Sequence, residues 1–549
     1  MKDKGIHLEI QRHRQNHYGL LRTTYWDKKE KKIKHSSHGR LTGLGYEKLK
    51  LIQAVLKGEA KLSTPSDMPR VCCSKEYGAV YSVLQLAKEL ELDKAIYSKS
   101  NEQWVKDCLA MIIGRLVYAG SKLALSNRYK DTALWELCGV DGVIDVDTHC
   151  YASMDRLLER QEAIQRNLAK KHFTGNALVL YDITSSYFEG EYSESNIVKF
   201  GYNRDHKRGY EQMVIGLICT SQGCPVGIEV FPGNTKDEAT VVDKINKLKQ
   251  TYKIEELIFV GDRGMVTKAN LEKVNNVKGL NTISALTHPQ IKELLSRKVV
   301  QIDLFDDKDI VEVVDPDNTK CRYCLCRNPE SARRETNTRN ALLAKTSEGL
   351  NKIASSKRKA TIEKISSRVG KLLSKTKMGK FITWEVLDEK LQWSLNTDLI
   401  DTEQLIDGCY IIVSDVSQEK MQAQEIVASY KKLALVEKAF RNLKTVQLEV
   451  RPVYHKTDER IRCHVFICML AYYLQWHMAR RLQSLFDNDD KYKKRFWTFE
   501  NVIERLKSIR REEINVAGAT CKIVTEPDDD QIKILALLKV KLHSHTMEK

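Results

Sequence analysis

Apolar residues run together through the middle of the chain, and this pattern predicts a mixed β-sheet. Residues 176–184 (NALVLYDIT) and 212–220 (QMVIGLICT) form strand-like runs, and a Ser-Gln-Gly turn leads to a third run at 225–231. A helical pattern follows over about 236–252, and a fourth strand-like run ends the series at 257–265 (LIFVGDRGM). Three strands, a helix and a further strand predict a meander followed by a right-handed crossover onto the same sheet.

The flanking segments have other patterns. Residues 1 to about 60 alternate around the polar turn DKKEKK, which predicts a small basic hairpin. Residues 75–172 place apolar side chains three and four apart, which predicts a helical domain. Strand-like runs at 281–287 and 408–415 bracket a stretch, 290–404, that combines strand-like pieces with polar helices. We therefore expect an α/β sheet that an insertion interrupts.

The charge of the chain changes this picture, because most of its excess lies in one segment. The 549 residues include 90 Lys and Arg against 73 Asp and Glu, a net charge of +17. Residues 331–380 alone hold 14 Lys and Arg against three acids, a net of +11, and Lys357, Arg358 and Lys359 lie at their centre. Such runs are usually solvated helix faces, but this density inside an insertion favours a nucleic acid partner.

Neither a membrane nor an oxidising compartment is indicated. The most apolar long run, Val465 to Trp476, is too short to span a bilayer, and the N-terminus carries no apolar signal stretch. Fourteen scattered cysteines fit reduced thiols, so we expect a cytoplasmic protein. Cys321, Cys324 and Cys326 have metal-like spacing, but no fourth ligand lies nearby, and a strand with buried cysteines is the better interpretation than zinc.

Two acids stand out because each interrupts or ends an apolar strand. Asp182 lies inside the first run and Asp262 ends the fourth, where an unpaired charge is costly. The strand after a crossover commonly lies beside the first strand, so the two carboxylates should meet. On a later predicted helix, about 418–443, Tyr430 and Glu437 are seven residues apart, and Lys444 follows after seven more, which predicts one shared face.

Together, Asp182, Asp262 and Glu437 would favour one class of metal ion. Three carboxylates without a neighbouring His or Cys suit Mg²⁺ or Mn²⁺ rather than zinc. Two such ions about 4 Å apart stabilise the attacking and leaving oxygens at phosphorus, which points to phosphodiester chemistry. The plainer alternative is that any one of these acids is an ordinary surface group, and this applies most to Glu437. His206, His455 and His464 are better interpreted as structural, because two-metal hydrolysis needs no histidine.

The segments around these three acids resemble those of a known protein family. The segments YDITSSYFEG, FVGDRGM and YKKLALVEKAFRNLK resemble the DDE transposases of bacterial insertion sequences, of the IS4-like superfamily and its IS1634-type branch. The likeness runs from about residue 175 to 480. That family has a glutamate-helix signature of Tyr, Arg, Glu and Lys, which Tyr430, Glu437 and Lys444 match in register. The Arg position holds Leu433, and Lys432 or Arg441 is the candidate to replace its contact with DNA.

The resemblance implies a fold: an RNase H-like α/β core with a mixed sheet, interrupted by a largely β insertion with basic helices. A small β hairpin module and a helical domain would precede it. The implied domains are the hairpin module (1–62), a helical DNA-binding domain (75–172), the catalytic core (173–289 and 405–483), the insertion (290–404) and a C-terminal region (484–549).

The resemblance also implies a function. Asp182, Asp262 and Glu437 would bind Mg²⁺, with Mn²⁺ as an alternative, and catalyse cleavage and joining of DNA. The implied partners are the terminal inverted repeats of the element and target DNA, bound by a homodimer in a synaptic complex at the bacterial nucleoid, with no membrane partner. The DNA-binding candidates are Tyr430, Lys444, Arg441, Lys357, Arg358 and Lys359.

Several alternatives stay open at this point. The chain could be an RNase H-fold nuclease that cuts without joining, or a DNA-binding protein derived from a transposase that has lost its chemistry. Trp384 and Trp393 lie in the insertion, where relatives stack a flipped base. Both are more simply interpreted as core aromatics.

Overall fold

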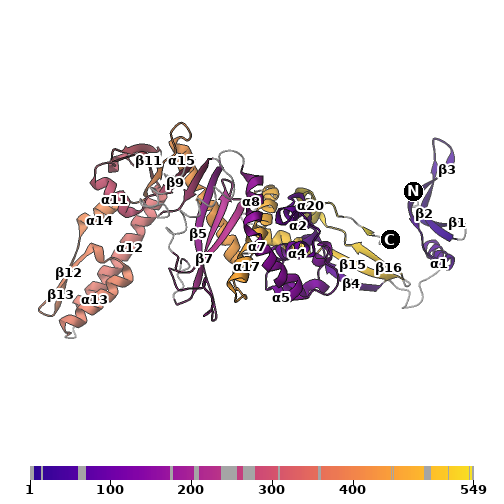
Figure 1. Ribbon diagram of the computed structural model, residues 1–549, viewed down its shortest axis with the longest axis horizontal. Coiled ribbons are helices and arrows are strands. Elements are labelled where there is room, and N and C mark those ends of the chain that lie inside the picture. The colour runs from indigo at the N-terminus through magenta and orange to yellow at the C-terminus, as the bar shows by residue number, and fades with distance from the viewer. Residues whose placement is uncertain are drawn as a thin grey trace. The chain divides into compact units, whose positions relative to one another are not determined.

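The computed structural model describes most of the chain in two compact units, each treated by itself (Figure 1). One unit comprises Met1–Tyr77, Ser508–Asp528 and Lys541–Lys549, and the other comprises Gly78–Lys507 and Asp529–Val540. The described residues are 5–13, 16–59, 70–173, 177–202, 204, 209–235, 256–263, 279–306, 309–356, 360–446, 448, 450–487, 496–516, 519–542 and 545–546.

The first unit is built from two small antiparallel sheets. The strands β2 (Asn16–Asp27) and β3 (Lys32–Leu41) form the hairpin that the sequence predicted, and β1 (His7–His13) pairs with β2 as a third strand. Helix α1 (Tyr46–Lys57) packs against this sheet, where Gly19 leaves room for its only deeply buried residue, Leu49. The second sheet has the order β17-β16-β15-β4. Its strands are β4 (Arg70–Glu76), β15 (Arg510–Val516), β16 (Ala519–Val524) and β17 (His545–Thr546).

The second unit begins with the predicted helical region. Its helices are α2 (Gly78–Glu89), α3 (Leu92–Ile96), α4 (Gln103–Val117), α5 (Lys122–Asn127), α6 (Leu134–Leu137), α7 (Ala152–Glu159) and α8 (Gln161–His172). Almost every residue of α4 is buried, because α4 packs against both α7 and the long helix α17 (Asp458–Arg481). At Gly114 an added Cβ would lie 2.6 Å from the side-chain end of Leu125, so this glycine lets α5 pack close against α4.

The predicted mixed sheet is present and has eight strands in the order β10-β11-β14-β9-β8-β5-β6-β7. The pairs β5–β8 and β8–β9 are parallel, and the other pairs are antiparallel. The strands are β5 (Ala177–Tyr187), β6 (Gln212–Thr220), β7 (Pro225–Pro232), β8 (Leu257–Gly261), β9 (Leu280–Ala285), β10 (Val311–Asp315), β11 (Asn318–Arg327) and β14 (Cys409–Ser414). The helix expected at 236–252 lies outside the described residues.

One face of this sheet carries the central core. Val179, Tyr181 and Ile183 alternate along β5 and pack with Phe259 of β8 and with Ala169 of α8. This period of two is what a sheet with a buried face requires. Helices α8 and α17 also pack against β7 at the sheet edge.

The segment expected to form the insertion divides between the sheet and a separate subdomain. Strands β10 and β11 extend the main sheet. Residues 298–303 (KVVQID), one of the strand-like pieces of the stretch 290–404, form no strand and lead into a short 3₁₀ turn, Ile302–Leu304. Strand β11 buries Cys321, Cys324 and Cys326, as the interpretation without zinc predicted. Helix α11 (His288–Ser296) precedes these strands and packs beneath them.

Between β11 and β14 the chain is mainly helical rather than largely β. This subdomain contains α12 (Pro329–Ala354), α13 (Ile362–Thr376), the hairpin β12 (Ile382–Leu387) and β13 (Lys390–Leu395), and α14 (Thr397–Leu405). Helices α12 and α13 pack side by side against the hairpin around a core that includes Leu350 and Val369 (Figure 1). Trp384 and Trp393 face each other across the hairpin and pack on this core, which supports their interpretation as core aromatics.

The chain ends in helices as well as in the strands of the first unit. These helices are α18 (Gln483–Asp487), α19 (Phe499–Lys507) and α20 (Asp529–Leu538). Among the described helices, none is by itself long and apolar enough to cross a bilayer; one sharply bent pair, Gln103–Val117 with Lys122–Lys130, meets the criteria of length and composition.

Candidate active site

The parallel pairing of β5 and β8 places two acids next to each other. Tyr181 of β5 is in register with Gly261 of β8, so Asp182 and Asp262 follow at the same level of the sheet. The expectation that the strand after the crossover lies beside the first strand is therefore confirmed. The Ser284 hydroxyl of β9 donates a hydrogen bond of 3.1 Å to the carbonyl oxygen of Asp262, which fixes the chain where it leaves β8.

Glu437 approaches these acids from a helix that covers the sheet. It lies on α16 (Leu433–Arg441), which packs against β5 and β6 through a buried face that includes Val436 and Phe440. The Glu437 side chain is exposed and borders this buried face of α16, one residue after Val436. Because the apolar stripe of α16 packs on the sheet, an acid at the border of that stripe holds its carboxylate near the sheet surface.

The charges of Asp262 and Glu437 both act on the Asp182 carboxyl. Burial raises the pKa of the Asp182 carboxyl to about 7, and the negative charges of Asp262 and Glu437 add to this effect. The hydrogen bond from the Ile183 N–H, 2.7 Å from Asp182 Oδ1, and the positive charge of Arg204 oppose it. A carboxyl in this position is stabilised as an anion when a cation is placed among the three groups.

The donor atoms of the trio fit hard divalent cations. Within the described part of the chain, the group whose ligand atoms all lie within 4.8 Å of one another is a different one, His172, Cys224 and His477. Carboxylates of this kind can share two ions that lie about 3.5–4 Å apart. All their donor atoms are carboxylate oxygens, which fits Mg²⁺ or Mn²⁺.

The helix predicted at 418–443 is broken, and this changes the role of Tyr430. The structure has α15 (Ala423–Lys431), a break at Lys432, then α16 and a π-helical turn, Asn442–Val446. Tyr430 and Glu437 therefore lie on separate helices. The Tyr430 hydroxyl donates to Asp262 Oδ1 at 3.1 Å, and burial together with the Asp262 charge raises the pKa of Tyr430.

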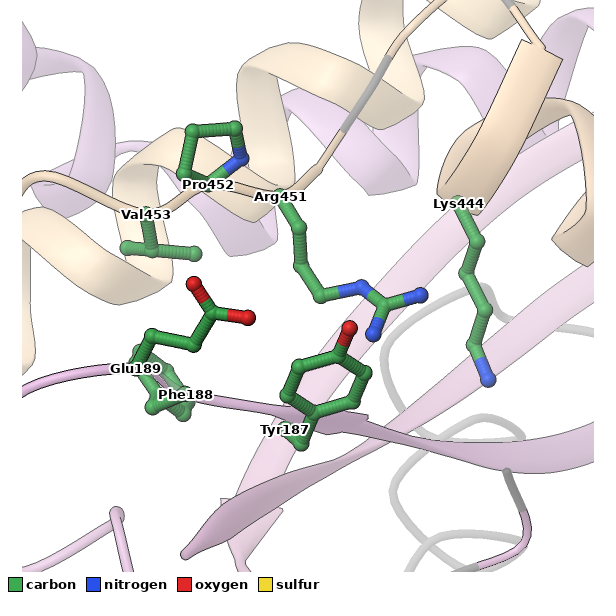
Figure 2. A pocket seen from close by; sticks show the side chains of 7 residues that line it. All are labelled: Tyr187, Phe188, Glu189, Lys444, Arg451, Pro452 and Val453. Atoms are coloured by element: carbon green, nitrogen blue, oxygen red, sulfur yellow. The ribbon is translucent and has the colours of Figure 1, made fainter. Parts of the chain in front are cut away.

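Lys444 lies in the π-helical turn after α16 and lines a pocket of about 430 Å³. Figure 2 shows the Arg451 guanidinium meeting the Tyr187 ring, with Lys444 on one side and Glu189 on the other. The guanidinium carbon lies 4.0 Å from the centre of the Tyr187 ring. Sequence interpretation missed Arg451 and Tyr187, because neither carries a spacing signal; only the fold brings the end of β5 to the residues after α16.

The remaining candidates fall into two groups. Leu433, at the Arg position of the signature, is buried, whereas Arg441 is exposed at the end of α16. Lys357, Arg358 and Lys359 lie outside the described residues. On the described helices of the subdomain, exposed cations nevertheless recur along α12 and α13: Arg333, Arg334, Lys345, Lys352, Lys364, Arg368, Lys371 and Lys375.

Two of the three candidate histidines, His455 and His464, lie in buried surroundings. Burial lowers the pKa of His455 to about 4 and that of His464 well below its usual range, so both rings are neutral near pH 7. His464 Nε2 lies 3.1 Å from the Val450 carbonyl oxygen, which it can satisfy as a donor. His206 lies outside the described residues.

Comparison with known proteins identifies the family of the chain. The family model described as "Transposase DDE domain" matches residues 175–474, more than half of the chain, and this range includes all three acids. No curated protein matches the chain. Among solved structures, the piggyBac transposase synaptic complex with hairpin DNA aligns over 80% of this chain and 81% of its own, with 8% identity and a TM-score of 0.37. On the domain match, the chain belongs to the DDE-domain transposases, the family that its sequence resembles.

Proposed function

We propose that the protein is the transposase of a bacterial insertion sequence of the IS1634-type branch. It would bind the terminal inverted repeats of its element, cleave the ends with water as the nucleophile, and join the freed 3′-OH to target DNA. The observation that carries this proposal is that Asp182 and Asp262 directly follow the last parallel pair of β5 and β8, Tyr181 with Gly261, with Glu437 close enough to act on the charge of Asp182.

The donor set fits divalent cations. Asp182, Asp262 and Glu437 would hold Mg²⁺ or Mn²⁺, and two such ions, when bound, supply stabilisation of the attacking and leaving oxygens. Tyr430 would act through Asp262, since its hydrogen bond sets the rotation of that carboxylate. Burial and like charges already disfavour an ionised Asp182, so this chain's own electrostatics favour a cation among the three groups.

DNA would be held by cations at two places. Lys444 and Arg451 line the pocket beside the end of β5, where a phosphate of the cleaved strand would lie. The exposed cations of α12 and α13, together with Lys357, Arg358 and Lys359 between them, would follow the duplex backbone. Arg441 would supply the contact for which the family signature uses an arginine four residues before the glutamate.

Joining two ends of one element needs two catalytic centres, so a homodimer in the synaptic complex is the expected assembly, working at the nucleoid in the bacterial cytoplasm. The test uses the genomic DNA that flanks the reading frame on both sides as labelled fragments. With Mg²⁺, the protein should nick at inverted repeats and transfer the 3′ ends to a plasmid. Nicking without transfer would indicate a nuclease, and binding without nicking would indicate a DNA-binding derivative.

Asp182→Asn should abolish both products, while Glu363→Gln, a change of an exposed acid on α13, should leave them intact. Equal loss in both variants would mean that the assay reports folding rather than the site.

A further inference from the structure

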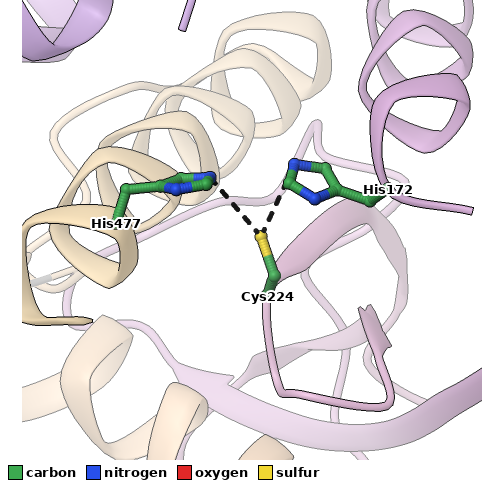
Figure 3. A group of neighbouring side chains, drawn as sticks. All are labelled: His172, Cys224 and His477. Atoms are coloured by element: carbon green, nitrogen blue, oxygen red, sulfur yellow. Dashed lines mark hydrogen bonds between the residues drawn. The ribbon is translucent and has the colours of Figure 1, made fainter. Parts of the chain in front are cut away.

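A second cluster of ligand-type side chains lies outside the carboxylate trio. His172 is the last residue of α8, Cys224 precedes β7, and His477 lies on α17. Cys224 Sγ lies 3.9 Å from Nε2 of His172 and 3.9 Å from Nε2 of His477. Figure 3 shows both imidazole rings meeting at the sulfur. Three segments that are distant in sequence therefore converge on one point.

We propose that His172, Cys224 and His477 form a site for a borderline-soft transition-metal cation of the Zn²⁺ type. Zinc binds thiolate sulfur at about 2.3 Å and imidazole nitrogen at about 2.0–2.1 Å in tetrahedral geometry, which separates sulfur and nitrogen by about 3.5 Å. The observed separation of 3.9 Å is close to that value, so small side-chain rotations would complete the geometry. One sulfur and two nitrogen donors are a set that Mg²⁺ does not prefer.

The chain holds Cys224 in place through a tight turn. The Gly223 N–H donates to the Thr220 carbonyl at 2.8 Å, and the Thr220 N–H donates to the Cys224 carbonyl at 2.9 Å. Gly223 has a φ of +81°, and a Cβ there would lie 2.9 Å from Cβ of Leu435, so the turn requires glycine. This rigid turn keeps the thiol directed at the two rings.

The same turn is linked to the helix that carries His477. Arg480 of α17 donates to Gln222 Oε1 at 2.8 Å. The site would therefore fasten α8 and α17 to the edge strand β7, three elements that already pack together. A structural metal contributes most where it joins segments that are far apart in sequence.

The surroundings favour the ligand forms of the histidines. Burial lowers the pKa of His477 to about 3 and also lowers that of His172, so both imidazoles are neutral and able to bind a metal. Cys224 is 1% exposed, and burial raises its thiol pKa. On binding, the thiol would release its proton to solvent, and the cation would offset the buried thiolate charge.

The fourth coordination position would be taken by water or by Tyr473. The Tyr473 hydroxyl lies 3.0 Å from His172 Nε2, and its ring centre is 4.6 Å from that of His477. Either ligand completes a four-coordinate ion. The site therefore depends on Cys224, His172 and His477 and not on the Tyr473 hydroxyl.

Co²⁺ titration of the full-length protein in excess Mg²⁺ tests the proposal, because Mg²⁺ occupies oxygen sites and a cobalt thiolate gives a charge-transfer absorption band. One Co²⁺ per chain should produce that band, and Zn²⁺ should displace it. The Cys224→Ala variant should lose the band, whereas Cys219→Ala, which removes another buried thiol on β6, should retain it. His477→Gln should weaken Zn²⁺ binding by about ten-fold or more.

Two outcomes would overturn the proposal. One is a wild-type protein that gives no thiolate band, and the other is a band that is equally strong in Cys224→Ala and wild type, since the exposed thiols Cys72 and Cys521 would then be its source. If Cys224→Ala does not fold by circular dichroism, the His477→Gln titration decides in its place, and unchanged Zn²⁺ affinity there refutes the site. None of these readouts depends on DNA cleavage, so they are independent of the proposed function.

Discussion

The Tyr430 hydroxyl and the Asp262 carboxylate are joined by a hydrogen bond of 3.1 Å across 168 residues of sequence. The bond connects the end of α15 to the first residue after β8, where the Asp262 side chain is otherwise exposed. A partner of this kind fixes the orientation of a carboxylate that is to bind a cation. Tyr430 is therefore a positioning residue, in addition to any contact it makes with DNA.

We expect Tyr430→Phe to weaken Mg²⁺ activation of strand cleavage by about 10-fold to 100-fold, because removal of a ligand's hydrogen-bond partner typically has this effect on a metal site. The measurement is the Mg²⁺ concentration for half-maximal nicking, which a purely structural role would not shift once the folded fraction is matched. Tyr454→Phe, at an exposed tyrosine, is the control. An unchanged Mg²⁺ requirement in Tyr430→Phe would limit Tyr430 to DNA contact.

We expect Asp182→Asn to keep DNA binding and lose cleavage. The amide preserves the shape of the side chain and removes the anionic ligand, while the exposed cations of α12 and α13 remain. Gel-shift and nicking assays on the same end fragment separate the two effects. Loss of binding together with cleavage would show that Asp182 supports the fold instead.

The positions of Asp182 and Asp262 could be predicted because local pattern and topology agree. Asp182 lies in an apolar strand and Asp262 directly follows one, and a crossover connection places those two strands side by side. The register of Tyr181 with Gly261 then brings both carboxylates to one level. For these two strands, the order of the elements in the sequence is enough to predict that they are neighbours in the sheet.

The broken helix could not be predicted in the same way. The segment ASYKKLALVEKAFRNLK contains neither Gly nor Pro, so nothing local interrupts it at Lys432. The break accompanies packing of α15 against β9 and β14 and of α16 against β5 and β6, which are tertiary contacts. Seven-residue spacing therefore did not keep Tyr430 and Glu437 on one straight helix.

Two other features also arise only from the fold. Strands β10 and β11 have the expected strand pattern, but periodicity does not specify which sheet a strand joins, and they extend the main one. His172 and His477 lie 52 and 253 residues from Cys224 in the sequence, too far for any motif spacing to reveal the cluster. Distant ligands can be recognised only after the chain has folded around them.

Because His455 and His464 are neutral in the folded protein, we expect the protein to lose stability at acidic pH. Burial, with the nearby charges of Lys122, Arg460 and Arg115, lowers the pKa of His455 to about 4, and its ring centre lies 5.6 Å from that of His464. Above about pH 6.5 the histidines are neutral in both folded and unfolded chains, so this contribution to stability is complete. As the pH falls from about 6.5 to 4, the unfolded chain binds protons that the folded chain excludes, and the free energy of unfolding decreases.

For His455 alone this loss amounts to at most about 3 kcal/mol by pH 4. Urea unfolding midpoints of His455→Gln and wild type at pH 7.5, 6 and 5 are the measurement. The difference in urea midpoint between the two proteins should become smaller, or change sign, toward low pH. Asp182 changes the stability with pH in the opposite direction, but it does so in both proteins, so its effect cancels in this difference. His288→Gln, at an exposed histidine, should follow the wild type; a His455→Gln curve parallel to wild type would contradict the prediction.

The last prediction concerns a basic stripe on α13. Lys364, Arg368, Lys371 and Lys375 are exposed and follow at intervals of four, three and four residues, so they share one face, next to the face that buries Ile365 and Val369. If this stripe follows duplex DNA, each neutralised phosphate contributes about 0.9 to the slope of log K against log salt. Changing Lys364, Arg368 and Lys371 to Gln should then lower the slope by up to about 2.7.

Folding should change little, because exposed charges usually alter stability by less than about 0.5 kcal/mol. The control replaces three exposed lysines of the C-terminal segment, Lys533, Lys539 and Lys541, which matches the change in net charge without touching α13. A general electrostatic attraction would lower the slope equally in both triple variants, whereas a DNA path along α13 lowers it only in the first. An unchanged slope in a well-folded α13 variant would make the stripe a solvated face, and the main phosphate contacts would then have to lie elsewhere on the chain.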